Sequence, residues 1–382
     1  MNANADNPLL KLRKLGQSVW QDDIGRTMLD DGALARLIQD DGIAGVTSNP
    51  AIFAASINKE PQYQRAIAEL LPKEASNIAL YETLTIEDLR RAADLFRKLY
   101  DSTNGGDGFV SMEVSPHLAH DTAGTNAEAK RLWARLERPN AMIKIPGTKA
   151  GLTAIRDTIA AGINVNVTLL FSPDRYRAVA NAYFDGLEAR LAADKPIDKI
   201  ASVASFFLSR IDTLVDKQLD DLAAKGKAEA RKLRGTSAIA SACRAYGIYE
   251  ELVASPRWKA LASRGARIQR LLWASTSTKD PTYSPVKYVE ELIAPDTVNT
   301  MPGETIKAYR SMGKPEPRLE PQIPGASQTF ATLQELGINM AAVADQLESE
   351  GVKKFIEPFD KLQASIEERR NSLMGSKSPV AL

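Results

Sequence analysis

The chain has 382 residues but only one cysteine, Cys243, so no disulfide can form within it. A lone cysteine, here in an apolar helical segment, is typical of a buried, inert thiol in a reducing compartment. The N-terminal stretch MNANADNPLLKLRKLG lacks the apolar run of a secretory signal. No run of about 18 or more apolar residues is present, as a membrane span would require. We therefore expect a cytoplasmic protein with no membrane partner.

The sequence also lacks an excess of charge of either sign. Lys and Arg number 49 and Asp and Glu 48, so nucleic acid is not expected as a partner. Small charged substrates remain possible, because a local pocket does not need a global field. His117 and His120 form an H-x-x-H pair, but no further ligand stands at a suitable spacing. We expect no metal there and assign both histidines to local capping or packing.

Short apolar segments alternate with helical patterns along the chain, and each is bounded by Gly, Pro, Asn or Asp. This alternation predicts the α/β class and a single (β/α)8 TIM barrel. A doubly wound open sheet is the alternative, although no G-x-G-x-x-G turn follows an early strand. The eight predicted strands are residues 18–22, 45–48, 108–114, 141–146, 163–170, 200–207, 268–275 and 296–301.

Two long connections and a C-terminal segment lie outside the repeating βα pattern. Residues 51–107 and 209–266 each carry extra helices. Residues 303–374 are mostly helical and are expected to pack on the barrel as an extension. We interpret the chain, residues 1–382, as one barrel domain, with a frayed tail at 375–382.

Polar residues follow one face of several predicted strands. In INVNVTLL, Asn164, Asn166 and Thr168 alternate with apolar residues, and in FVSMEV, Ser111 and Glu113 do the same. The apolar sets should face the helices, which directs the polar sets into the barrel. Interiors of such barrels are usually filled by branched apolar side chains, so these polar residues are unusual.

The polar positions gather near the C-terminal ends of predicted strands one to five, which is the catalytic face of a (β/α)8 enzyme. Burial of carboxylates, an amine and amides costs several kcal/mol unless they pair. Each residue alone could be a satisfied core hydrogen-bonding group, but together they predict an active site. The set comprises Asp22, Asn49, Glu113, Lys144, Asn166 and Thr168, and Thr47 shares one face with Asn49.

Lys144 lies in the apolar strand AMIKIP. Desolvation lowers a lysine pKa from its ordinary value of about 10.4. The neutral amine can then form a Schiff base with a ketone, an electron sink for carbon–carbon cleavage. Asp22 suits the acid/base role at the substrate hydroxyl, and Glu113 could act through a water held by Thr168. The alternative is that Lys144 only seals the barrel in an ion pair with Glu113 or Asp22.

Three motifs, GVTSNPAIF (45–53), MIKIPGT (142–148) and GINVNVTLLFS (162–172), resemble the transaldolase family. WASTSTKDPTYS and TVNTMP resemble its longer bacterial branch, and the resemblance covers about residues 15–302. It implies transfer of a dihydroxyacetone unit from sedoheptulose 7-phosphate to glyceraldehyde 3-phosphate, in the pentose phosphate pathway. The products would be erythrose 4-phosphate and fructose 6-phosphate. It also implies no cofactor, and we expect a monomer or homodimer.

The resemblance assigns roles to matching residues. Lys144 would form the imine, Asp22 would serve the cleaved hydroxyl, and Glu113 and Thr168 would hold the catalytic water. Asn49 and Asn166 would bind donor hydroxyls, and we place Thr47, on the same face as Asn49, with the substrate-binding residues.

The segment SFFLSRID resembles the phosphate-binding region of the family. Ser205, Phe207 and Arg210 occupy its serine, phenylalanine and arginine positions, although Arg210 could instead pair with a nearby aspartate, Asp212 or Asp216. Better known members carry a second arginine shortly after a serine behind strand seven. This chain offers Ser275 and Lys279 in ASTSTKD, which gives a point charge without the bidentate fork.

Two other functions are compatible with these residues. A related fructose-6-phosphate aldolase would release free dihydroxyacetone, but such relatives tend to carry an amide at the Glu113 position. A catalytically inactive barrel could bind sugar phosphates, although a pure binder has no need for a buried amine.

Overall fold

The computed structural model describes residues 6–375. Eight parallel strands pair in chain order, and β8 closes the barrel against β1. This closure confirms the predicted (β/α)8 fold and excludes the open doubly wound sheet. The strands are β1 (Gln17–Gln21), β2 (Gly45–Val46), β3 (Phe109–Glu113), β4 (Ala141–Pro146), β5 (Val165–Leu170), β6 (Ser202–Phe207), β7 (Arg270–Ala274) and β8 (Thr297–Met301).

Each strand overlaps the segment predicted for it, and the ends differ by a few residues. The shortest strand, β2, ends at Val46, two residues before the end of the predicted segment 45–48. The chain turns there because Asn49 caps the next helix, accepting a hydrogen bond from the backbone N–H of Ile52 at 3.0 Å. Asp22 lies directly after β1, so its side chain stands at the C-terminal rim of the barrel.

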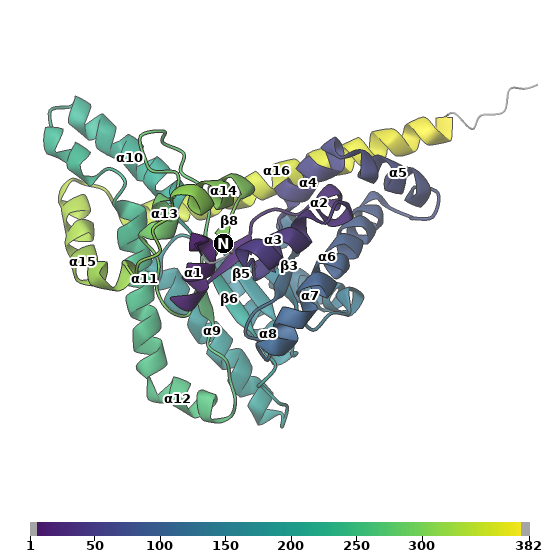
Figure 1. Ribbon diagram of the computed structural model, residues 1–382, viewed down its shortest axis with the longest axis horizontal. Coiled ribbons are helices and arrows are strands. Elements are labelled where there is room, and N and C mark those ends of the chain that lie inside the picture. The colour runs from purple at the N-terminus through teal and green to yellow at the C-terminus, as the bar shows by residue number, and fades with distance from the viewer. Residues whose placement is uncertain (1–5, 376–382) are drawn as a thin grey trace, which may run out of the picture.

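Helices surround the barrel (Figure 1). A proline at the first turn and a capping side chain mark several starts; Ser172, for example, accepts from the N–H of Arg175 in front of α9. The helices before β5 are α1 (Pro8–Lys14), α2 (Arg26–Asp30), α3 (Ala33–Asp41), α4 (Pro50–Lys59), α5 (Pro61–Leu70), α6 (Asn77–Ser102), η1 (Pro116–Leu118), α7 (Thr122–Leu136) and α8 (Lys149–Ala160). Those after β5 are α9 (Pro173–Ala192), α10 (Ser209–Ala224), η2 (Ala228–Leu233), α11 (Ser237–Ala254), α12 (Pro256–Ser263), α13 (Lys287–Glu290), α14 (Gly303–Met312), α15 (Leu319–Glu335) and α16 (Met340–Gly375).

The long α16 crosses the C-terminal end of the barrel. It packs against α4, α6, η1, β5 and α10, and Figure 1 shows it as the yellow helix that runs past α4 and α5. At Gly351 the approach is so close that an added Cβ atom would lie 2.9 Å from Cδ2 of Leu169. The C-terminal segment therefore covers the end of the barrel where the polar strand residues lie.

Leu169 departs from the expected alternation. Its φ is +60°, and the register of β5 against β6 shifts between Val167 and Leu170. The alternation predicted that Leu169 would face the helices outside the barrel. That prediction is wrong, because the irregularity directs the side chain toward Gly351 of α16.

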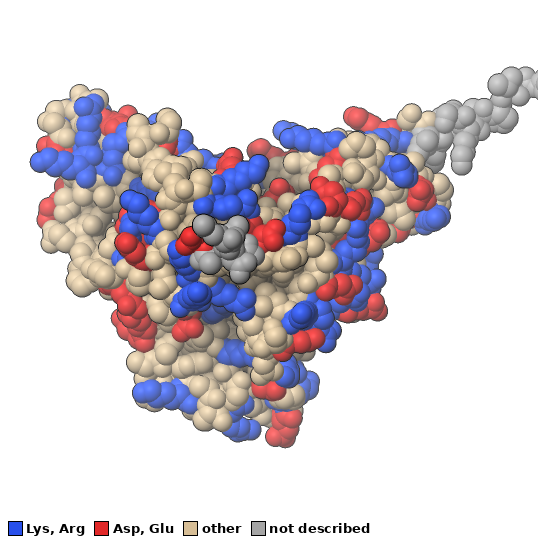
Figure 2. Space-filling view, in the orientation of Figure 1, with Lys and Arg blue, Asp and Glu red and all other residues tan. Residues whose placement is uncertain are grey.

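Basic and acidic side chains intermix over the face shown in Figure 2, as the balanced composition predicts. Within residues 6–375, no helix is long and apolar enough to cross a membrane. His117 contacts Asp360 of α16, with 2.7 Å between Nε2 and Oδ1, and so joins η1 to the C-terminal helix. No group of three metal-binding side chains is found in the described part of the chain.

Candidate active site

Lys144 lies at the centre of the polar cluster inside the barrel. Its Nζ donates a hydrogen bond to the carbonyl oxygen of Ser48 at 3.0 Å and lies 3.7 Å from Oε2 of Glu113. The Lys144 and Glu113 side chains are 5% and 2% exposed. Strand pairing sets this arrangement, because Glu113, Lys144 and Asn166 stand in register across β3, β4 and β5. The amine and the carboxylate are neighbours, but at a separation longer than a hydrogen bond.

The Glu113 carboxyl group is buried, and few polar contacts offset the cost of its desolvation. Among the described residues, no group donates a hydrogen bond to either of its oxygens. Burial raises the pKa of Glu113 to about 7, the nearby Lys144 charge offsets only part of that effect, and Asp22 adds to it. Glu113 can therefore exchange a proton near neutral pH. The Thr168 hydroxyl, also buried, likewise lacks a partner within the described chain.

Asn166 is fixed by hydrogen bonds to both sides of its amide. Its Nδ2 donates to Oγ of Ser111 at 3.0 Å, and its Oδ1 accepts from Oγ of Ser205 at 2.7 Å. These bonds link β3, β5 and β6 through the barrel interior. Ser205, predicted to bind substrate, thus directs its hydroxyl to Asn166, so its present contact orients that amide.

The rim beside Asp22 is held by two threonines. Oγ1 of Thr47 donates to Oδ1 of Asp22 at 2.8 Å, and it lies 2.8 Å from Oγ1 of Thr300 in β8. Asp22 itself is half-buried. Asn49 uses its amide oxygen to cap α4, which leaves the amide nitrogen as the group that can reach a ligand. The structure therefore joins Thr47 to Asp22 directly, and Asn49 follows two residues after Thr47 at the start of α4.

Arg210 and Phe207 form the cationic side of the site. The guanidinium carbon of Arg210 lies 5.3 Å from the centre of the Phe207 ring, which in turn contacts Phe171 at 5.4 Å between ring centres. Nη1 of Arg210 is buried and has no hydrogen-bond partner in the described residues. Burial lowers the pKa of Arg210, although arginine remains charged.

The two aspartates considered as partners of Arg210 are occupied elsewhere. Asp212 accepts from the N–H of Ala238 at 2.7 Å, and Asp216 accepts from the N–H of Gly235 at 2.8 Å. Arg210 is therefore available to an anion from outside the chain.

The remaining predicted phosphate-binding residues lie on the loop after β7. Ser275 has a left-handed backbone, with φ +56°, and its Oγ lies 2.8 Å from Oγ of Ser209 at the start of α10. Lys279 is exposed and donates to Oγ of Ser277 at 2.8 Å. Ser275 is thus close to the α10 end that carries Arg210, whereas Lys279 extends to the surface.

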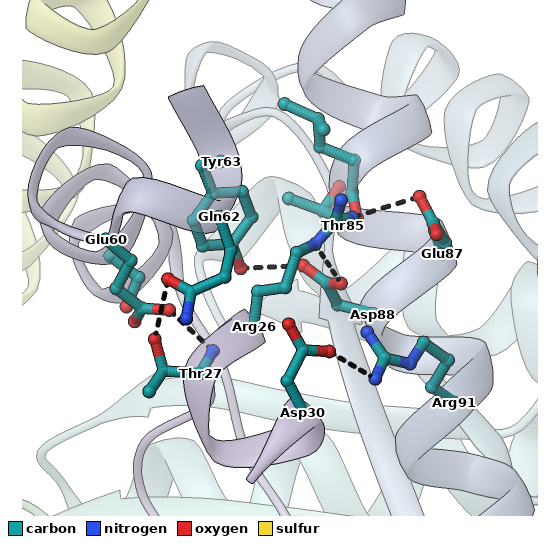
Figure 3. Close-up of polar contacts among 12 residues, drawn as sticks. Arg26, Thr27, Asp30, Glu60, Gln62, Tyr63, Thr85, Glu87, Asp88 and Arg91 are labelled. Atoms are coloured by element: carbon teal, nitrogen blue, oxygen red, sulfur yellow. Dashed lines mark hydrogen bonds and ion pairs between the residues drawn. The ribbon is translucent and has the colours of Figure 1, made fainter. Parts of the chain in front are cut away.

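A buried ion-pair network supports the loop that carries Asp22 (Figure 3). Nε of Arg26 donates to Oδ1 of Asp88 at 2.9 Å, and the Tyr63 hydroxyl donates to Oδ2 at 2.6 Å. Next to this pair, Glu60 accepts a hydrogen bond from the N–H of Thr27 at 2.8 Å. These contacts tie the start of α2, directly after the loop that carries Asp22, to α5 and α6.

Several residues of the site were not singled out from the sequence. Thr300, Phe171 and the Ser48 carbonyl contact predicted residues, but their types are common in strands and loops. Tyr81, at the start of α6, and Phe359 of α16 pack edge-to-face with 5.5 Å between ring centres. Tyr81 and Phe359 line one cavity with Glu113. Only the fold brings these two aromatics next to β3.

A closed parallel barrel with a buried lysine, a partnerless carboxyl group and a rim of polar side chains defines an enzyme of the (β/α)8 class. A model of the transaldolase/fructose-6-phosphate aldolase family matches residues 19–366. The chain therefore belongs to this family.

Named relatives agree over nearly the full length. Transaldolase 2 of Nostoc sp. is 46% identical over 371 residues, which cover 95% of this chain and 97% of the relative. Transaldolase of Trichodesmium erythraeum is 46% identical over 376 residues, or 96% and 98% of the two chains. Transaldolase of Thiobacillus denitrificans is 46% identical over 353 residues, or 92% and 98%.

Proposed function

We propose that this protein is a transaldolase, which moves a dihydroxyacetone unit from sedoheptulose 7-phosphate to glyceraldehyde 3-phosphate through an imine on Lys144. The observation that carries the proposal is the buried amine of Lys144, 3.7 Å from a carboxyl group without a hydrogen-bond donor among the described residues. The names of the full-length relatives support the same activity.

In the first half-reaction, Nζ of Lys144 bonds to the ketone carbon of the donor. The carbonyl oxygen leaves as water, and Glu113 supplies a proton through a water molecule shared with Thr168. Asp22 then takes the proton of the donor C4 hydroxyl as the C3–C4 bond breaks. Erythrose 4-phosphate departs, and the electron pair of the broken bond remains in an enamine on Lys144.

In the second half-reaction, the enamine carbon attacks the aldehyde carbon of glyceraldehyde 3-phosphate. Asp22 returns its proton to the new hydroxyl, and water regenerates the amine of Lys144 and the ketone of fructose 6-phosphate. The Asn166 amide, fixed by Ser111 and Ser205, and the Asn49 amide nitrogen would hold the hydroxyls of the three-carbon unit. Thr47 would keep Asp22 oriented.

The phosphate would bind beside Phe207, on the guanidinium of Arg210. Ser275, next to the start of α10, would add a hydroxyl donor, and Lys279 would strengthen the local field from the surface loop. No cofactor is required for this chemistry in the proposal.

The proposal extends to organisation and location. We assign the chain to one barrel domain with residues 303–374 as an extension, a description supported by the packing of α16 on α4, η1 and β5. The predicted tail, 375–382, lies outside the described residues except for Gly375. We further propose a cytoplasmic monomer or homodimer that acts on small sugar phosphates; the single cysteine supports a reducing compartment, and the balanced charge gives no reason to expect nucleic acid as a partner.

Borohydride reduction in the presence of fructose 6-phosphate tests the imine. The expected result is a reduced adduct on Lys144, found by peptide mass spectrometry, that is lost in Lys144→Met and kept in Lys149→Met. Lys149 is the matched control because it is exposed at the start of α8. Absence of any adduct on the folded protein would overturn the proposal. Rapid release of dihydroxyacetone without an acceptor would instead favour the aldolase alternative.

A further inference from the structure

One side of α10 carries a row of aspartates close to Arg210. Asp212, Asp216 and Asp220 follow one another at four-residue spacing, which places them as neighbours along the helix. Asp212 and Asp216 are only 1% and 5% exposed, although carboxylates normally lie at the surface. Burial of such groups is costly unless they receive hydrogen bonds, so their partners identify what the row holds in place.

The first two aspartates of the row bind the segment between β7 and β8. The Tyr288 hydroxyl donates to Oδ2 of Asp212 at 2.7 Å, and the Tyr283 hydroxyl donates to Oδ2 of Asp216 at 2.6 Å. Nζ of Lys287 adds a hydrogen bond of 3.2 Å to Asp212. Three side chains of this segment therefore attach to α10.

The third aspartate, Asp220, reaches the same segment through an arginine. Arg234 pairs with Asp220 on one side and with Asp280 on the other. The next residue, Gly235, has φ +69°, and a Cβ atom added to it would lie 2.9 Å from Cζ of Tyr283. The glycine thus lets the segment pack directly on the backbone that follows Arg234.

The attached segment begins with the loop that we propose binds phosphate. Ser275, directly after β7, has a left-handed backbone with φ +56°, a conformation that non-glycine residues rarely adopt. Its carbonyl oxygen accepts from the N–H of Ser209 at 3.2 Å, and the two hydroxyl oxygens lie 2.8 Å apart. The Thr276 hydroxyl donates to the carbonyl oxygen of Thr300 at 2.8 Å. The loop therefore meets α10 next to Arg210.

We propose that Asp212 and Asp216 are positioning residues, which hold the loop after β7 against α10 through the two tyrosine hydroxyls. In this way the Ser275 hydroxyl and the Arg210 guanidinium stay in position to bind one phosphate group. This inference rests on the proposed function, and on its phosphate site in particular. A displacement of the loop separates the two phosphate-binding groups, whereas the imine lysine on β4 is unaffected.

Borohydride trapping of the Lys144 imine with two donors tests this role. Fructose 6-phosphate carries a phosphate, whereas dihydroxyacetone offers the three-carbon ketone without one. The donor concentration that gives half-maximal adduct is measured for each donor with the full-length protein. The test variants are Tyr283→Phe and Tyr288→Phe, each of which removes one hydroxyl from a buried aspartate. We expect this concentration to rise about fivefold or more for fructose 6-phosphate, since a hydrogen bond to a charged group is lost, and to stay unchanged for dihydroxyacetone.

Tyr183→Phe is the matched control. It also removes a buried tyrosine hydroxyl, which donates to the carbonyl oxygen of Arg267 at 2.7 Å. Arg267 precedes β7, at the opposite end of this strand from Ser275. We expect neither donor to be affected in the control.

The outcomes are separable. No adduct with either donor in the unmodified protein would defeat the proposed function itself, and equal half-maximal concentrations for the two donors would defeat its phosphate site. An unchanged concentration for fructose 6-phosphate in both test variants, or a rise of equal size for both donors, would overturn the positioning role alone. If the variant at buried Tyr288 does not fold, Tyr283→Phe, at a half-buried position, decides by the same criterion.

Discussion

Replacement of Glu113 by glutamine tests the electrostatics of the site without any substrate. The neutral amide has nearly the shape of the carboxyl group but cannot ionise. In the folded protein, burial raises the pKa of Glu113 from its ordinary value of 4.5 to about 7. Each pKa unit corresponds to about 1.4 kcal/mol, so the ionised form costs the folded state about 3 kcal/mol.

The sign follows from proton binding. Below pH 4.5 the group is protonated in both states, and it has no effect on stability. Between pH 4.5 and about 7 the unfolded chain has released the proton while the folded protein retains it. The free energy of unfolding therefore falls as pH rises through this window, and the loss is complete above pH 7. Glu113→Gln removes this contribution.

We expect the stability of Glu113→Gln relative to the unmodified protein to increase by about 2–3 kcal/mol between about pH 5 and pH 8. Urea unfolding at both pH values measures the difference. Glu69→Gln, at an exposed site on α5, is the control and should show no such change. A relative stability that is independent of pH, or that falls with pH, would refute the argument that burial outweighs the attraction of Lys144.

Three further changes test other parts of the site. Arg210→Lys removes the planar fork and the contact with Phe207, so KM for fructose 6-phosphate should rise about tenfold with a smaller change in kcat; an unchanged KM would place the phosphate elsewhere. Gly351→Leu should displace α16, because even a Cβ atom there would lie 2.9 Å from Leu169, and steady-state assays should show a higher KM. Gly325→Leu is the control and should leave KM unchanged, because no atom lies within 4 Å of its Cβ position. Tyr63→Phe leaves one oxygen of buried Asp88 without its 2.6 Å donor and should lower the free energy of unfolding in urea by about 1–3 kcal/mol; a smaller loss would show that water replaces the hydroxyl.

The strands and their inward faces could be predicted from sequence because both depend on local patterns. Alternation of polar and apolar residues in β3 and β5 directs Glu113 and Asn166 into the barrel, and chain-order pairing then brings them beside Lys144. Strand ends were less predictable. β2 ends at Val46 and Asn49 caps α4 three residues later, and the length of β2 also depends on its pairing with β1 and β3.

Contacts between distant segments could not be predicted in the same way. Leu169 leaves the expected face because of the β5–β6 register shift, and Gly351 of α16 lies where its side chain now points. Arg26 and Asp88 are charged residues in helical segments, where such side chains are normally solvent-exposed. Only the packing of α5 and α6 against α2 buries them together.

The helices outside the βα repeat account for the raised pKa of the buried Glu113 carboxyl group. The connection before β3 supplies Tyr81, the C-terminal extension supplies Phe359, and α7 supplies the wall around Ala127. These segments keep Glu113 away from bulk solvent, and the resulting desolvation moves its pKa toward neutrality, where a group can both donate and accept a proton. A bare barrel would leave the carboxyl end of β3 open to water, and Glu113 would remain ionised. In this protein the segments outside the βα repeat therefore set the proton affinity of the site, while the strands set its geometry.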